Sequence, residues 1–244
     1  MRERINVLLL ITELNIGGAE RIVAQLATRL PRDRYDVKFA CLYDPEAVGA
    51  DIRAAGIPVI HLNMRSKLDL RAPYRLFRLL REQNIHILHA HLFHANLLAA
   101  TVGKLARVPV VIATRHNVDI GGAGREWLNR RTRNLCDAVI AISQEVHEAE
   151  LQRSRTHSSR VILIPNGVQI EIFAGVDSGN VKELAREWDT NVNTPIIGTL
   201  ARLHEQKGHT YFLDAVAKLR DEIPDVKACL LYTSPSPRDL STSR

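Results

Sequence analysis

The sequence predicts an α/β fold with a doubly wound parallel Rossmann-like sheet, followed by an incomplete second Rossmann-like domain. Short runs rich in Val, Ile and Leu alternate with helical patterns along the chain. Strands that are buried on both faces have this composition, and their alternation with helices is typical of parallel sheets. The expected strands are Ile5–Ile11, Val37–Leu42, Pro58–Leu62, Ile85–His89, Pro109–Ala113, Ala138–Ile142, Val161–Ile164, Pro195–Leu200 and Val226–Leu231.

The first run, in "MRERINVLLLIT", has the charge-then-apolar order of a secretory signal. The run is short, Asn6 interrupts it, and Glu13 follows without a small-residue cleavage site, so we expect a buried strand. No segment approaches the roughly 18 consecutive apolar residues of a membrane-spanning helix. The three cysteines, Cys41, Cys136 and Cys229, are far apart, which favours reduced thiols and a cytoplasmic location.

The composition limits the classes of partner. The chain carries 33 Lys and Arg against 27 Asp and Glu, a net charge of +6. This mild excess suits phosphorylated ligands or an anionic membrane surface, and it is smaller than nucleic-acid binding requires. Only 5% of the residues are aromatic, which argues against base stacking. We therefore expect no nucleic-acid partner.

The first helical pattern, from Ala19 to Leu30, has apolar residues at helical spacing. Gly17 and Gly18 in "TELNIGGAER" open it. Their missing side chains would let a phosphate approach the backbone N–H groups, and a tight strand-to-helix turn explains them equally well. G-x-G-x-x-G is absent and Asp44 lies beyond the second strand, which argues against a nicotinamide-dependent oxidoreductase.

Histidines gather near the ends of the fourth and fifth strands, where ligands of such sheets bind. No carboxylate or cysteine lies near the first group in sequence, so packing explains it better than a metal site, and we expect no metal. His116 either contacts a substrate or bonds to a neighbouring loop. The residues concerned are His86, His89, His91 and His94 in "HILHAHLFH", and His116 and Asn117 in "ATRHN".

The stretch "IGTLARLHEQKGH", residues 197–209, places Arg202 and Lys207 between a strand and a helix. Free backbone N–H groups and the helix dipole favour negative charge there, and two cations add to it. We expect this loop to bind phosphate.

The helical pattern in "LDLRAPYRLFRLLREQN" places four arginines on one face, with leucines largely opposite. The face is either a dock for anionic lipid or a solvated surface over a buried one, and we favour the second interpretation. The arginines are Arg71, Arg75, Arg78 and Arg81.

Six motifs, in this order over residues 5 to 231, resemble those of retaining glycosyltransferases with two Rossmann-like domains, the GT-B type, in the family described as glycosyl transferases group 1 or family four. The motifs are "GGAERIVAQLA", "HAHLFHANLLA", "TRHN", "CDAVIAISQEV", "IPNGV" with Phe173, and "GTLARLHEQKGH". "IPNGV" alone is only a turn signal.

This resemblance implies transfer of a sugar, with retention, from a nucleotide-diphosphate sugar to a saccharide or lipid-linked acceptor. It implies no cofactor or metal, a role in cell-envelope polysaccharide or glycolipid synthesis, and a cytoplasmic protein that can contact the inner face of the plasma membrane. The implied catalytic residues are His116, Arg202 and Lys207; the donor phosphates would meet Gly17, Gly18, Arg202 and Lys207, and His91 and Asn117 would lie on the acceptor side.

The resemblance also implies domains. We expect an acceptor-side domain at residues 1–190, the truncated start of a nucleotide-sugar domain at 191–231, and a disordered tail at 232–244 that is either foreign or native. Two departures are mild: Ala201 replaces a usual Gly, and Gln169 a usual Asp. The family's two glutamates, with seven residues between them, do not follow Lys207, so we expect this chain to be inactive. A nucleotide-sugar epimerase on the same fold and a non-catalytic binding module remain alternatives.

Overall fold

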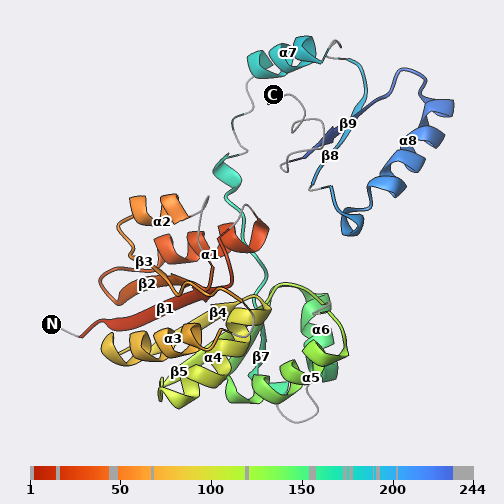
Figure 1. Ribbon diagram of the computed structural model, residues 1–244. Coiled ribbons are helices and arrows are strands. Elements are labelled where there is room, and N and C mark those ends of the chain that lie inside the picture. The colour runs from red at the N-terminus through yellow and green to blue at the C-terminus, as the bar shows by residue number, and fades with distance from the viewer. Residues whose placement is uncertain are drawn as a thin grey trace. The chain divides into compact units, whose positions relative to one another are not determined.

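The computed structural model describes residues 3–14, 17–43, 49–66, 69–118, 121–153, 158–172, 175, 178–188, 190, 193–201 and 203–232. The chain forms two compact units, residues 1–168 and 169–244 (Figure 1). The sequence predicts a boundary at residue 190, whereas the second unit begins at residue 169 and also includes helix α7 (Ser178–Glu187).

The first unit contains a seven-stranded sheet in the order β3-β2-β1-β4-β5-β6-β7, and every neighbouring pair is parallel. This confirms the predicted α/β fold. Each expected strand is present, with its ends shifted by at most two residues. The strands are β1 (Ile5–Ile11), β2 (Tyr35–Cys41), β3 (Val59–His61), β4 (Ile87–His91), β5 (Val110–Arg115), β6 (Ala138–Ala141) and β7 (Val161–Leu163).

Helices cover both faces of this sheet, with α1 and α2 on one face and α3 and α4 on the other (Figure 1). Successive side chains of a strand point to opposite faces, so Leu9 packs towards the α1 side and Leu8 towards the α3 side. The sheet is therefore buried between two apolar cores. The helices are α1 (Gly18–Arg29), α2 (Gly49–Ala54), α3 (Arg71–Glu82), α4 (Phe93–Leu105), α5 (Ala123–Thr132) and α6 (Gln144–Arg153), with short 3-10 turns η1 (Arg133–Leu135) and η2 (Ser158–Arg160).

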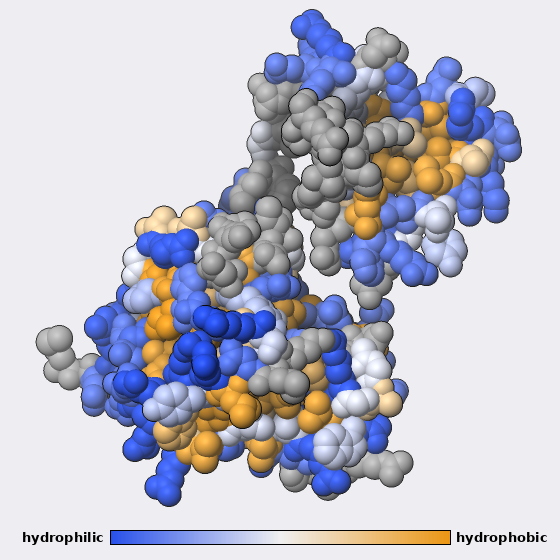
Figure 2. All heavy atoms as spheres, viewed as in Figure 1, coloured by the Kyte–Doolittle hydropathy of each residue, from blue (hydrophilic) through white to orange (hydrophobic). Residues whose placement is uncertain are grey.

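The second unit contains a parallel pair of strands, β8 (Ile196–Leu200) and β9 (Lys227–Leu231), with helix α8 (His209–Glu222) between them in sequence. Two 3-10 turns, η3 (Ile170–Ile172) and η4 (Glu205–Lys207), and α7 complete it. Apolar side chains of the strands remain accessible, among them Leu200 at 72% and Leu231 at 43% exposure. Figure 2 shows hydrophobic residues gathered on the visible face of this unit.

Within the residues that the structure describes, no helix is both long and apolar enough to cross a membrane. Residues 233–244, most of the expected tail, lie outside the described residues, as do Asp44, Phe173 and Arg202.

Candidate functional site

The carboxyl ends of β4 and β5 bring the predicted histidines together. In the register of these parallel strands His91 is opposite Thr114, and His116 follows two residues later. Two residues along a strand return to the same face, so His116 reaches the side chain of His91. Nδ1 of His91 lies 3.2 Å from Nε2 of His116, within hydrogen-bond distance.

His89 adds a third ring to this histidine cluster, which we define as His89, His91 and His116. Its Nε2 atom lies 2.7 Å from the hydroxyl oxygen of Thr114, and its ring centroid lies 4.3 Å from that of His91. The prediction that His89 and His91 share one strand face is confirmed.

Burial controls the charge of the cluster. It lowers the pKa of His89 and of His116 to about 4, and it lowers the pKa of His91 well below the ordinary value. The neutral ring is favoured because transfer of an imidazolium out of water is costly. At pH 7 the cluster is therefore uncharged, and its rings interact as hydrogen-bond donors and acceptors.

The other two histidines of "HILHAHLFH" lie elsewhere. His86 directly precedes β4, at the amino end of that strand. Its Nδ1 atom accepts a hydrogen bond from the backbone N–H of Asn6 at 3.0 Å. The ring of His94 packs edge-on against Phe93. Among the described residues, no group of three or more His, Cys, Asp and Glu side chains is arranged to hold a metal ion.

The predicted contact residues at the ends of β4 and β5 differ in accessibility. His91 is only 2% exposed, His116 is partly buried, and Asn117 is exposed. In this conformation a ligand could reach Asn117 and His116 directly. The expected acceptor-side role of His91 stays a prediction. Because His91 is buried, this residue would act through His116.

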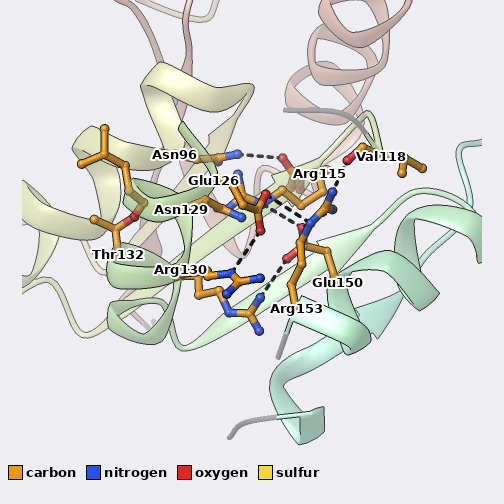
Figure 3. Close-up of polar contacts among 12 residues, drawn as sticks. Asn96, Arg115, Val118, Glu126, Asn129, Arg130, Thr132, Glu150 and Arg153 are labelled. Carbon is orange, nitrogen blue, oxygen red and sulfur yellow. Dashed lines mark hydrogen bonds and ion pairs between the residues drawn. The ribbon is translucent and has the colours of Figure 1, made fainter. Parts of the chain in front are cut away.

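The segment that carries His116 and Asn117 is held at both ends by polar contacts (Figure 3). Before it, Arg115 donates to the side-chain oxygen of Asn129 on α5. After it, the carbonyl oxygen of Val118 accepts a hydrogen bond of 2.6 Å from Nη2 of Arg153 on α6. Helices α5 and α6 thus hold a side chain before the histidine and a backbone carbonyl after it.

One buried carboxylate joins these contacts. Glu150 on α6 is 0% exposed, and its oxygens lie 3.3 Å from Arg153, 3.6 Å from Arg133 and 3.9 Å from Arg115. Arg115 and Arg133 are themselves 5% and 6% exposed. Burial lowers the pKa of both guanidinium groups, and the charge of Glu150 opposes this shift. The charge of Glu150 therefore stabilises the two buried guanidinium groups in their charged form. We call these four residues the Glu150 cluster.

The Glu150 cluster is not among the sites that the sequence motifs predict. Arg115 is part of the motif "ATRHN", but that motif predicts a role only for the next two residues, His116 and Asn117. A signal for Glu150 exists, because it follows the buried Val146 by four residues and therefore shares its helix face.

The turn at Gly17 and Gly18 precedes α1, with Gly17 as an extended N-cap. A side chain at Gly17 would require the carboxylate of Glu20 to move, because that carboxylate lies against the position that a Cβ would occupy. Glu20 is 9% exposed. A carboxylate thus already lies at the positive end of this helix, whereas a Cβ at Gly18 would meet open space. The phosphate role of the two glycines stays a prediction.

In the second unit the predicted order of strand, basic loop and helix is present. Lys207 is exposed at the end of η4, and Gly208 follows in the left-handed conformation, with φ 66° and ψ 30°, as the N-cap of α8. The first turn of α8, all of it described, contains no acidic residue. The first turn of α8 therefore adds no carboxylate to the cation that precedes it, which suits an anion.

Comparison with known proteins defines the family. The model of Glycosyltransferase Family 4 matches residues 16–172, more than half of the chain. The protein therefore belongs to Glycosyltransferase Family 4, and the family expected from the motifs is confirmed.

Individual relatives agree with this assignment. Over 223 residues, 86% of the chain, it is 24% identical to the Escherichia coli UDP-Gal:alpha-D-GlcNAc-diphosphoundecaprenol alpha-1,3-galactosyltransferase. Over 237 residues, 88% of the chain, it is 26% identical to the putative glycosyltransferase EpsF of Bacillus subtilis. The matches span 57% and 58% of these relatives' lengths.

The fold is shared with the crystal structure of Anabaena Alr3699/HepE in complex with UDP. That similarity has a TM-score of 0.79 at 20% identity and covers 98% of this chain and 64% of the other.

Proposed function

We propose that this protein takes part in transfer of a sugar from a nucleoside-diphosphate sugar, with UDP as the first candidate nucleotide, to a saccharide or lipid-linked acceptor. The observation that carries the proposal is the N-terminus of α8 with Lys207 and Gly208 before it. Family membership supports it, as do the names of the E. coli galactosyltransferase and of the UDP complex of the Anabaena protein.

The proposed chemistry needs an anion site more than a protein nucleophile. The bond between the anomeric carbon and the β-phosphate oxygen breaks, and a bond from the acceptor oxygen to that carbon forms. The acceptor hydroxyl loses its proton to the departing phosphate. We propose that attack occurs on the face that the diphosphate leaves, which gives retention.

Negative charge develops on the diphosphate as it leaves. Lys207, Arg202 and the N–H groups of α8 are proposed to stabilise it, the role that a metal ion has in other enzymes. His116 is proposed to contact the transferred sugar. Each neutral hydrogen bond of this kind contributes about 0.5–1.5 kcal/mol, and bonds to charged groups about 1.5–3 kcal/mol.

The arginine face of α3 supports a finer proposal, peripheral contact with anionic lipids that would bring the enzyme to a lipid-linked acceptor. Arg71 and Arg81 are exposed on this face, together with Tyr74 at 63% exposure. Arg75 donates to the carbonyl of Leu62 at 2.8 Å, and Arg78 pairs with Glu82, so these two arginines also make contacts within the fold. Sedimentation with phosphatidylglycerol vesicles should weaken in Arg71→Glu/Arg81→Glu, and unchanged sedimentation would contradict the lipid contact.

Calorimetry with UDP tests the anion site. Arg202→Ala and Lys207→Ala should each weaken binding roughly 10- to 150-fold, the equivalent of a charge-assisted hydrogen bond of about 1.5–3 kcal/mol. Lys218→Ala, an exposed lysine further along α8, is the matched control. If both variants bind UDP as the unmodified protein does, the phosphate site is elsewhere.

A further inference from the structure

His91 is a buried ring with one nitrogen paired and one unpaired. Its Nδ1 atom faces Nε2 of His116 at 3.2 Å, and its Nε2 atom has no hydrogen-bond partner among the described residues. Because the neutral imidazole has one donor and one acceptor nitrogen, the pair has two possible arrangements.

The two arrangements leave different groups unpaired. If His116 donates, then His91 Nδ1 accepts, and the proton of His91 is on Nε2, where it is a buried donor without an acceptor. If His91 donates from Nδ1, its Nε2 atom is a bare acceptor. Buried N–H groups without partners are rarer in proteins than under-used acceptors. The second arrangement is therefore favoured, and it places the proton of His116 on Nδ1.

The backbone directly after His91 is strained. Leu92, the next residue, has φ 70° and ψ 161°, a conformation that is unfavourable for a residue with a side chain and is almost restricted to glycine. Leu92 packs against the buried core on the α1 side of the sheet. Such strain persists where the surroundings enforce it, and it is concentrated at functional sites.

The partner strand is fixed as well. The buried side chain of Asn96, in the first turns of α4, donates to the carbonyl oxygen of Thr114 at 2.9 Å. The turn after His91 is thus tied to the strand end that carries His116, and the two rings are held in register.

We propose that His91 is a positioning residue that donates Nδ1–H to Nε2 of His116 and so leaves Nδ1–H of His116 as a hydrogen-bond donor for the ligand. The ligand atom would then be an acceptor, a hydroxyl or ring oxygen of the sugar. The identity of that ligand rests on the proposed function, whereas the tautomer of His116 does not.

Nitrogen NMR of the 244-residue chain, labelled with ¹⁵N-histidine and free of ligand, tests the tautomer. The proposal predicts a pyrrole-type signal for Nδ1 and a pyridine-type signal for Nε2 of His116. The preference should be about tenfold or more, which corresponds to about 1.4 kcal/mol. A pyrrole-type Nε2 in the unmodified chain would overturn the proposal, whatever any variant does.

Variants then test the role of His91. In His91→Phe the tautomer preference of His116 should fall to less than about threefold, a loss of roughly 0.7 kcal/mol or more. In His91→Asn it should be retained, because the amide N–H group can replace Nδ1–H. His147→Gln, on α6 outside the cluster, is the control. An unchanged preference in His91→Phe would refute the positioning role, and if that variant does not fold, His91→Asn and the unmodified chain decide.

A kinetic readout separates this proposal from the proposed function. In a full-length form of the protein, His91→Phe should lower kcat about tenfold with the KM for the donor unchanged, and His91→Asn should recover most of it. If His116 has the predicted tautomer and no transfer occurs in any form, the proposed function fails and the positioning stands. If transfer occurs but kcat is the same in His91→Phe, the positioning has no catalytic role.

Discussion

Replacement of Glu150 by glutamine tests whether a buried ionic cluster holds the loop of His116. Glutamine keeps the size of the side chain and a carbonyl oxygen that can accept from Arg153, 3.3 Å away. It removes the negative charge that Arg115 and Arg133 face in the interior. The expected result is a less stable first unit with a looser segment at residues 116–118.

The size of the effect follows from the burial. Removal of one partner of a buried ion pair typically costs about 3–5 kcal/mol, because the other charge remains buried. Glu150 is 0% exposed and two of its three arginines are at most 6% exposed, so this range applies. For a unit of this size, about 2–4 °C of Tm per kcal/mol gives a decrease of roughly 6–20 °C.

Urea unfolding followed by tryptophan fluorescence is the assay. Trp127 lies on α5 of the first unit, so a Trp188→Phe background gives a signal from this unit alone. Glu145→Gln, an exposed carboxylate on the same helix, is the control and should change the stability by no more than about 0.5 kcal/mol. If Glu150→Gln lowers the free energy of unfolding no more than Glu145→Gln does, the Glu150 cluster does not hold the loop of His116.

Two further predictions concern the histidine cluster. His116→Ala should lower kcat in a full-length form about 10- to 100-fold while calorimetry finds the Kd for UDP unchanged, because its partner would be the sugar; equal losses in both would place His116 at the phosphates. The pKa values of about 4 for His89 and His116, below the ordinary value near 6.5, mean that the unfolded chain binds protons first as the pH falls. The free energy of unfolding should therefore be greatest above pH 6.5 and should decrease towards pH 4 by up to about 1.4 kcal/mol per pH unit and histidine. Urea unfolding at pH 7 and 4.5 measures this decrease. If His116→Gln loses as much stability between these two pH values as the unmodified chain, the low pKa of His116 is contradicted.

Most of the fold follows from the apolar pattern of the sequence. The strand ends are the least predictable part, because backbone pairing, rather than the apolar pattern, decides where a strand begins and ends. Strand β4 was expected at Ile85–His89 and is observed at Ile87–His91, since its backbone hydrogen bonds with β1 and β5 continue through the polar end. This shift matters for the site, because it brings His91 into register with Thr114.

The candidate site was predictable in its types of residue and less so in their contacts. The motif after β5 indicated His116, but only the three-dimensional register shows that His91 is its hydrogen-bond partner. Glu150 lies in a helix rich in charge, so its burial depends on packing against residues distant in sequence, such as Arg115. Long-range ion pairs leave little trace in a local pattern.

The most direct test of the central claim is product analysis with a full-length form of the protein. Purified protein is incubated with UDP-sugars, with and without saccharide or lipid-linked acceptors, and the nucleotide and sugar products are separated. We expect release of UDP and a new glycoside that depends on the acceptor, and loss of both in Lys207→Ala. Interconversion of the nucleotide sugar without an acceptor would indicate an epimerase, and binding of the nucleotide without turnover in any form would indicate a non-catalytic module. Either result would contradict the proposed sugar transfer.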